Sequence, residues 1–217
     1  MASSEGIISR NPADLLFTPR EAKTAVRRVM NLEEVRKCLM ALDLRERLIV
    51  KLALLAGMRP GEIFALTWKR LHDDRAEIVQ RIYQTDIDTP KSKQSERTAA
   101  LPERMRADVE AWRANAINAN ADAWVFPSET LKTPITKDNC WRRSIYPKLA
   151  AAGLSWVTFQ VMRRTHSSLM KGLGVDGKLV ADQLGHTLDV NQNVYTQSAL
   201  ADRQAAVNRL EKSLLIH

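Results

Sequence analysis

The chain has 217 residues, 45% of them hydrophobic, with a formal net charge of +8 and a pI of about 9.7. This length and apolar content predict one domain with a sizeable core, or one domain with an extension, and the basic charge favours a polyanionic partner. No apolar run is long enough to span a bilayer and the start lacks a signal-peptide pattern, so we expect a soluble, cytoplasmic protein and no membrane partner.

Residues 1–30 have little periodicity and contain Pro12 and Pro19. This stretch is typical of a linker or arm. The first strong signal follows at Asn31, because Asn31 and Glu34 have the spacing of a capping box and predict the start of a helix. The two cysteines, Cys38 and Cys140, match no metal-ligand spacing and no disulfide framework, which indicates reduced thiols in a reducing compartment.

Two helices are predicted before residue 57. Their expected core positions are Leu32, Val35, Leu39 and Leu42 in the first helix and Leu48, Ile49, Leu52, Leu55 and Ala56 in the second. Gly57 is expected to end the second helix. Pro60 suits the first turn of a third, which leaves Arg59 at the junction.

Arg59 and Glu62 stand three residues apart and allow two interpretations. The first is an ordinary ion pair on a helix surface, worth about 0.3 kcal/mol. In the second, Glu62 holds the Arg59 guanidinium so that its planar fork can meet a phosphate with two hydrogen bonds. The pair by itself favours the first interpretation, and only the later motifs favour the second.

Residues 68–101 predict a small antiparallel sheet. Short branched or aromatic stretches at 76–79, 81–83 and 98–101 alternate with polar turns. Lys91 and Lys93 lie in the polar connection before the last of these stretches. Most such lysines are simply solvated.

Further helices are predicted after Pro102 and after Thr136, which can cap the second of them. We assign no chemistry to this part of the chain. Tyr83 and Tyr146 are interpreted as core or edge residues.

Residues 158–186 contain two more predicted helices. Phe159, Met162, Leu169 and Leu173 recur at near-helical spacing, so Arg163 would project from a helix that packs against the core. Gly172 and Gly174 are expected to close this helix. The next helix starts near Asp176, directs Leu179, Val180 and Leu184 inward, and ends at Gly185, just before His186.

Arg163, His186 and the later Tyr195 could converge on one anion. Each has an ordinary alternative, since a lone histidine after a helix is favoured there by the dipole alone. His166, on the same helix as Arg163, is interpreted as a packed histidine. Residues 199–215 form an amphipathic segment with Ala205, Leu210, Leu214 and Leu215 apolar, which could pack on its own domain or on a neighbouring molecule.

Four ordered motifs carry a family resemblance. They are Leu55-Ala-Gly-Met-Arg59, the stretch from Thr89 to Pro102 with Lys91 and Arg97-Thr, Gln160-Val-Met-Arg163, and Leu184-Gly185-His186 followed by Tyr195. Between about residues 31 and 200 the chain resembles the tyrosine recombinase (phage integrase) family. It departs from the family at Gln160, where a histidine is usual.

The resemblance implies an α+β, mainly α-helical catalytic domain with a small antiparallel sheet on one side. It divides the chain into three parts. Residues 1–30 would be a linker or arm at the end of a missing N-terminal DNA-binding domain. Residues 31–198 would be the catalytic domain, and residues 199–217 a C-terminal helix or tail. In the family this tail often packs on the adjacent protomer.

The resemblance also implies the catalytic residues Arg59, Lys91, Gln160, Arg163, His186 and Tyr195. The arginines and His186 would hold a phosphate, Tyr195 would attack it, and Lys91 would protonate the leaving oxygen. Lys93 is the nearest rival of Lys91. Glu62 would support Arg59, and Lys93, Arg97 and Arg164 are expected to contact DNA. This chemistry uses no metal and no ATP, so no cofactor is expected.

The implied function is site-specific recombination of double-stranded DNA through a 3′-phosphotyrosyl intermediate. The expected partners are further copies of the chain, as a tetramer on DNA, and accessory DNA-bending proteins, and the expected location is the nucleoid. One alternative is a related type IB topoisomerase-like enzyme or resolvase. Another, suggested only by Gln160, is a non-catalytic DNA-binding relative.

Overall fold

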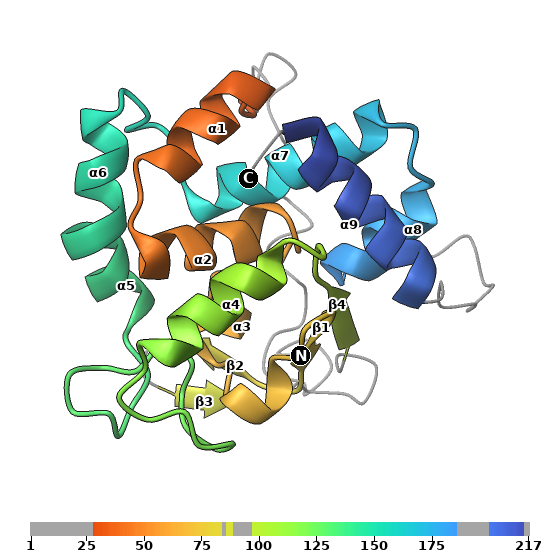
Figure 1. Cartoon of the computed structure of the whole chain (residues 1–217). Coiled ribbons are helices and arrows are strands. Elements are labelled where there is room, and N and C mark those ends of the chain that lie inside the picture. The colour runs from red at the N-terminus through yellow and green to blue at the C-terminus, as the bar shows by residue number, and fades with distance from the viewer. Residues whose placement is uncertain (1–27, 84–85, 89–96, 186–199, 215–217) are drawn as a thin grey trace, which may run out of the picture.

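The computed structural model describes residues 28–83, 86–88, 97–185 and 200–214 (Figure 1). The described part is mostly helical. Its helices, including one 3₁₀ turn and one π turn, are α1 (Leu32–Met40), α2 (Leu44–Leu54), α3 (Pro60–Phe64), the 3₁₀ turn Trp68–Arg70, α4 (Met105–Ala114), α5 (Lys137–Cys140), the π turn Trp141–Ile145, α6 (Tyr146–Ala151), α7 (Phe159–Gly172), α8 (Gly177–Leu184) and α9 (Leu200–Leu214).

The capping box predicted at Asn31 starts α1. The Glu34 amide donates to Asn31 Oδ1 at 2.8 Å, and the Asn31 amide donates to Glu34 Oε2 at 2.9 Å. These bonds satisfy two of the amides that a helix start leaves without a partner. The local sequence signal and the structure therefore agree at this position.

Helix α2 lies at the centre of the core, packed against α1, α4 and α7 (Figure 1). Every residue from Leu48 to Leu54 is buried. A charged side chain, Lys51, is among them, and its Nζ lies 2.6 Å from Asp108 Oδ2 on α4. This pairing satisfies a charge that burial alone would penalise.

The strands form two short antiparallel ladders. Strand β1 (Arg75–Ile78) pairs with β4 (Arg97–Ala100), and β2 (Arg81–Tyr83) pairs with β3 (Asp86–Asp88). The predicted antiparallel sheet is confirmed, but in two parts. Between β1 and β2, the Gln80 side chain donates to the Ala65 carbonyl at 2.7 Å and helps turn the chain from one ladder to the other.

Strand β2 packs tightly against the start of α3. A Cβ added at Gly61 would lie 2.5 Å from the Ile82 carbonyl oxygen, so only glycine allows this approach. The second ladder therefore lies directly beside Arg59.

Helices α7 and α8 begin and end where the sequence predicts. Thr158 caps α7 through its side chain, Gly174 follows its end with φ +71°, and Asp176 caps α8. One core assignment is wrong: Leu173 is 37% exposed, because it lies past the last turn of α7 and faces away from the core.

Helix α9 packs on its own domain, against α1, α7, α8 and β4 (Figure 1). Its buried face consists of Ala206, Val207, Leu210 and Leu214, whereas Ala205, which the sequence placed on the apolar face, is exposed. Arg36 Nε of α1 donates to the Leu214 carbonyl at 2.5 Å and so caps the end of α9. Among the described helices, none has the length and apolar content needed to cross a membrane.

Candidate active site

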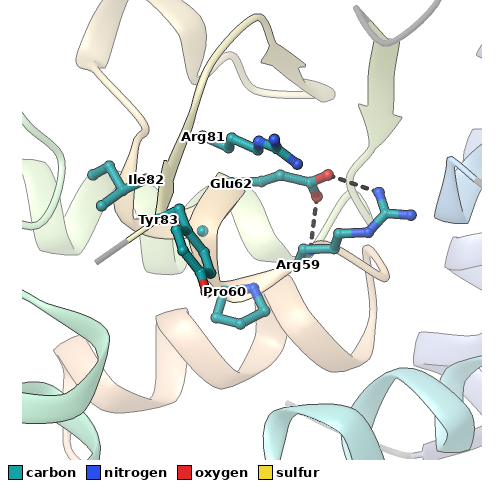
Figure 2. Close-up of a pocket in the computed structure, with 7 residues that line it drawn as sticks. Arg59, Pro60, Glu62, Arg81, Ile82 and Tyr83 are labelled. Carbon is teal, nitrogen blue, oxygen red and sulfur yellow. Dashed lines mark hydrogen bonds and ion pairs between the residues drawn. The ribbon is translucent and has the colours of Figure 1, made fainter. Parts of the chain in front are cut away.

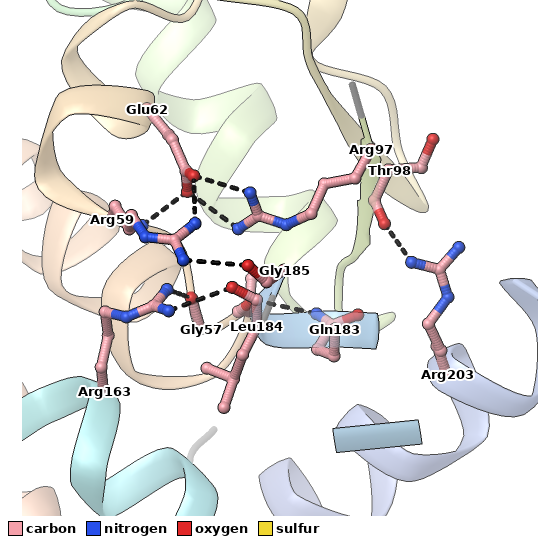
Figure 3. Close-up of polar contacts among 11 residues, drawn as sticks. Gly57, Arg59, Glu62, Arg97, Thr98, Arg163, Gln183, Leu184, Gly185 and Arg203 are labelled. Atoms are coloured by element: carbon pink, nitrogen blue, oxygen red, sulfur yellow. Dashed lines mark hydrogen bonds and ion pairs between the residues drawn. The ribbon is translucent and has the colours of Figure 1, made fainter. Parts of the chain in front are cut away.

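Three arginines from distant parts of the chain gather around one buried carboxylate, Glu62 (Figure 3). Arg59 precedes the first turn of α3, Arg97 is the first residue of β4, and Arg163 lies on α7. The two glycine turns at Gly57 and Gly185 lie beside them. We call Arg59, Glu62, Arg97 and Arg163 the arginine cluster.

Each oxygen of Glu62 accepts two hydrogen bonds. Oε1 accepts from Arg59 Nη1 at 2.9 Å and from Arg97 Nη1 at 2.6 Å, and Oε2 accepts from the Arg59 amide at 2.7 Å and from Arg97 Nη2 at 2.8 Å. Burial on its own raises the pKa of the Glu62 carboxyl. Hydrogen bonds and positive charge from Arg97, and then from Arg59, outweigh burial and bring this pKa below its ordinary value.

Arg59 is held at two points and remains partly open to solvent. Its Nη1 donates to Glu62, its Nη2 donates to the Gly185 carbonyl at 2.9 Å, and its side chain is 44% exposed. Since Glu62 is only 6% exposed, the pair differs from the ordinary helix-surface ion pair that was the first interpretation. Its geometry matches the second interpretation, a guanidinium oriented by a buried carboxylate.

Arg163 is bound by backbone carbonyls. Its Nη1 donates to the Gly57 carbonyl and its Nη2 donates to the Leu184 carbonyl at 3.0 Å. Burial, followed by the nearby charge of Arg59, lowers the pKa of Arg163 to about 10. The guanidinium therefore stays charged at neutral pH, in a position where a positive charge is costly without an anion.

Glycine is required where these carbonyls turn toward the arginines. Gly57 has φ +66°, and a Cβ there would lie 2.7 Å from Leu184 Cδ2. Gly185 has φ +61° and forms the left-handed cap of α8. Both turns need a residue without a side chain, for reasons of backbone conformation and of space.

From the sequence, Arg97 is expected to contact DNA, but the structure places its side chain against Glu62. Its guanidinium makes a two-pronged contact with Glu62, and its side chain is only 10% exposed. Little of it remains to reach a DNA backbone. The sequence analysis missed the pairing with Glu62, because the two residues are 35 positions apart and no local spacing connects them.

Buried Gln183 is a second residue that sequence reasoning missed. Its Nε2 donates to the Ala56 and Ala100 carbonyls, both at 2.9 Å, and its Oε1 accepts from the Ala100 amide at 3.1 Å. One side chain thus joins α8 to β4 and to Ala56, just after α2, beside the cluster (Figure 3).

The other predicted site residues divide into two groups. Gln160 is exposed in the first turn of α7, and Arg164 is half-buried beside Arg163. Lys91, Lys93, His186 and Tyr195 lie outside the described residues. Arg97 follows the stretch that contains Lys91 and Lys93, Gly185 precedes His186, and Arg97 and Gly185 are in close contact at the cluster.

His166 is fully buried behind the cluster, as expected for a packed histidine. Its Nδ1 lies 2.9 Å from the Leu54 carbonyl, so Nδ1 carries the proton and donates. Burial lowers the pKa of His166 to about 4. Within the described ranges, no three His, Cys, Asp or Glu side chains are grouped as metal ligands would be.

A hollow of about 440 Å³ opens beside Arg59 (Figure 2). It is lined by Arg59, Pro60, Gly61, Glu62, Arg81, Ile82 and Tyr83. The Tyr83 side chain is 70% exposed and lies next to Pro60, at the edge of the hollow. The hollow therefore leaves Arg59 accessible from the side of the β2–β3 ladder.

The cluster has the electrostatics of an anion site. Its three guanidinium groups and one carboxylate leave an excess of two positive charges among these four side chains. Fixed guanidinium groups match the charge and geometry of phosphate oxygens.

The sequence model of the phage integrase family matches residues 23–201. The ICEBs1 integrase of Bacillus subtilis (strain 168) is 27% identical over 231 residues, and the alignment covers 93% of this chain. This chain spans only about 60% of the length of that relative.

Several solved structures share the fold. The Tn1549 transposon integrase in complex with transposon right end DNA has a TM-score of 0.65 and 19% identity, over 94% of this chain and 72% of that one. The integrase from mycobacterium phage Brujita has a TM-score of 0.63 and 17% identity, over 96% and 66% of the two chains. XerA recombinase has a TM-score of 0.61 and 16% identity, over 92% and 68%. These matches confirm the predicted fold.

Proposed function

This chain belongs to the phage integrase family, and we propose that it is a site-specific DNA recombinase that cleaves and rejoins DNA through a phosphotyrosyl link. The observation that carries the proposal is the arginine cluster, in which Arg59 and Arg163 are fixed side by side with excess positive charge. Such a site suits a phosphate whose oxygens gain charge during the reaction.

In the proposed reaction, the Tyr195 phenolic oxygen attacks the phosphorus of one DNA strand. The bond from phosphorus to the 5′ oxygen breaks, that oxygen takes a proton from Lys91, and the 3′ phosphate stays on Tyr195. A tyrosine has an ordinary pKa of about 10, and nearby cations favour its ionised form. The phosphotyrosyl link conserves the energy of the phosphodiester, so a 5′ hydroxyl of another strand can reverse the step.

The remaining predicted residues support this reaction. Arg59, Arg163 and His186 would hold the nonbridging oxygens, and Gln160 would donate one more hydrogen bond through its amide. Glu62 would keep Arg59 oriented. Lys93 and Arg164 would contact the DNA backbone.

The proposed partners follow from this chemistry. Exchange of strands between two duplexes needs several active sites, and we propose a tetramer on double-stranded DNA, assisted by DNA-bending proteins. A DNA substrate would also keep the chain associated with the nucleoid.

A covalent adduct assay tests the proposal. The chain is incubated with nicked suicide duplexes taken from the DNA that flanks its gene, and adducts are separated in denaturing gels. We expect a DNA-linked band with the unaltered chain and none with Tyr195→Phe, which still binds DNA. Tyr83→Phe is the matched control, because it removes the hydroxyl of an exposed tyrosine beside Arg59, and it should keep the adduct.

Other outcomes point to other functions. DNA binding without an adduct would favour the non-catalytic relative, for which Gln160 is the motivating observation. Relaxation of a supercoiled plasmid that lacks any flanking sequence would favour a topoisomerase-like enzyme. An adduct with Tyr195→Phe would indicate that the nucleophile is Tyr83 or Tyr146, the other tyrosines of the chain.

A further inference from the structure

We propose that Arg97 is a positioning residue of this site, which holds Glu62 in the orientation that fixes Arg59 against the Gly185 turn for the cleavage step. The inference rests on the proposed function and gives Arg97 a role other than the DNA contact that the sequence suggests. It follows from three observations: the contact of Arg97 with Glu62, its packing against Gly185, and its burial.

The contact between Arg97 and Glu62 is bidentate, the geometry in which an arginine fixes the orientation of a carboxylate most strongly. Nη1 and Nη2 of Arg97 each donate to a different oxygen, at 2.6 and 2.8 Å. The plane of the Glu62 carboxylate is thereby set, and with it the directions in which the Arg59 amide and Nη1 can donate. A lysine could not impose this plane, since it donates from a single point.

Arg97 also packs against the turn that receives the other end of Arg59. A Cβ added at Gly185 would lie 2.6 Å from Arg97 Nε and 2.8 Å from its Cζ. The Gly185 carbonyl accepts from Arg59 Nη2 at 2.9 Å. Arg97 therefore lies against both groups that hold the Arg59 guanidinium, and Figure 3 shows the hydrogen bonds that lead from Arg97 through Glu62 and Arg59 to Gly185.

This placement gives Arg97 a chemical effect beyond packing. Glu62 is buried, and burial favours its protonated form, which has lost its negative charge and in which one oxygen has become a donor. Arg97 supplies the largest opposing influence and keeps the pKa of Glu62 low. Without Arg97, the Glu62 pKa should rise, and Arg59 should lose its partner as the pH falls.

Single-turnover cleavage of a suicide duplex, measured as a function of pH in saturating protein, tests the inference. We expect Arg97→Met to slow cleavage by about tenfold at pH 8 and by about a hundredfold at pH 5.5, while its affinity for DNA changes less than about threefold. Arg97→Lys retains the charge and should slow cleavage by nearly the same factor at both pH values.

The matched control is Lys51→Met. Lys51 is also a buried cation paired with a carboxylate, Asp108, but it lies between α2 and α4, away from the cluster. It should lower stability and leave the pH dependence of cleavage unchanged. If Arg97→Met slows cleavage by one factor at every pH, or if it mainly weakens DNA binding, Arg97 is a packing or DNA-contacting residue and the inference is wrong.

A second measurement does not depend on activity. Carboxyl carbon NMR can follow the titration of Glu62, identified by the signal that Glu62→Gln removes. In Arg97→Met, or in the equally uncharged Arg97→Gln if the methionine variant does not fold, the Glu62 pKa should lie higher than in the unaltered chain. An unchanged pKa would overturn the inference. A raised pKa in a chain that forms no DNA adduct would retain this positioning role and reject only the proposed function.

Discussion

At the scale of single residues, His166 is buried behind the arginine cluster as a neutral ring. Burial lowers its pKa to about 4, against an ordinary value of 6.5. The unfolded chain therefore binds a proton between these two pH values that the folded chain excludes, so stability is lost as the pH falls through this window. Above pH 6.5 the contribution is fully present.

We predict that the free energy of unfolding falls by about 2 kcal/mol between pH 7 and pH 5 because of His166. Urea unfolding at the two pH values measures the change. His166→Gln cannot take up a proton and should remove most of this difference, although it lowers stability at pH 7. An equal pH dependence in both proteins would mean that His166 does not titrate as its burial requires.

Gln160 is the residue at which the chain departs from its family. It is exposed in the first turn of α7, three residues before Arg163 and therefore on the same side of the helix. If it serves to hold the phosphate through its amide, Gln160→His should change the cleavage rate less than about tenfold, and Gln160→Ala should slow it by more than about tenfold. Single-turnover cleavage measures both variants. A large gain in the histidine variant, over a nearly inactive parent, would show instead that catalysis is degraded in this chain.

At the scale of secondary structure elements, the site depends on helix ends more than on helix faces. Arg59 precedes α3, Gly57 follows α2, and Gly185 ends α8. Helix ends leave carbonyls without partners inside the helix, and such carbonyls accept hydrogen bonds from the guanidinium groups of Arg59 and Arg163.

Helix α9 is the element whose packing the sequence left open. Leu210 is fully buried against the domain, so Leu210→Ala should lower the free energy of unfolding by about 3 kcal/mol. Urea unfolding of the isolated chain tests this, with the exposed Lys212→Ala of the same helix as a control that should change stability by less than about 0.5 kcal/mol. No effect of Leu210→Ala would mean that α9 is not docked on its own domain in solution.

At the scale of the whole molecule, the net charge of +8 is the property most relevant to a DNA partner. If the chain follows phosphates, its affinity should fall at least about a hundredfold between 50 and 200 mM salt, because each phosphate contact releases counterions. Fluorescence anisotropy with labelled duplex measures the slope of affinity against salt. Arg164→Gln should remove one phosphate contact and so reduce the slope of log affinity against log salt concentration by about one. Arg106 is already paired with Glu110, so Arg106→Gln should leave this slope unchanged. An affinity that is insensitive to salt would contradict a phosphate-tracking surface.

The sequence by itself determined the features that depend on near neighbours. The start of α1 at Asn31, the cap at Thr136 and the end of α8 at Gly185 were predicted because capping residues act within one helical turn. The family was recognisable for a related reason, since each of its motifs is a short local stretch. Arg59, Glu62 and Arg163 could be named as candidates from these stretches.

Only the tertiary structure decided which side chains meet across long stretches of chain. Three features join residues that are far apart in sequence. They are the contact of Arg97 with Glu62, the hydrogen bonds of Gln183 with Ala56 and Ala100, and the packing of α9 on its own domain. Leu173 was assigned wrongly because helical spacing continues past the point where α7 actually ends. Spacing along the chain specifies which face of an element is apolar, but the partner of a buried charge is specified by the packing of all elements together.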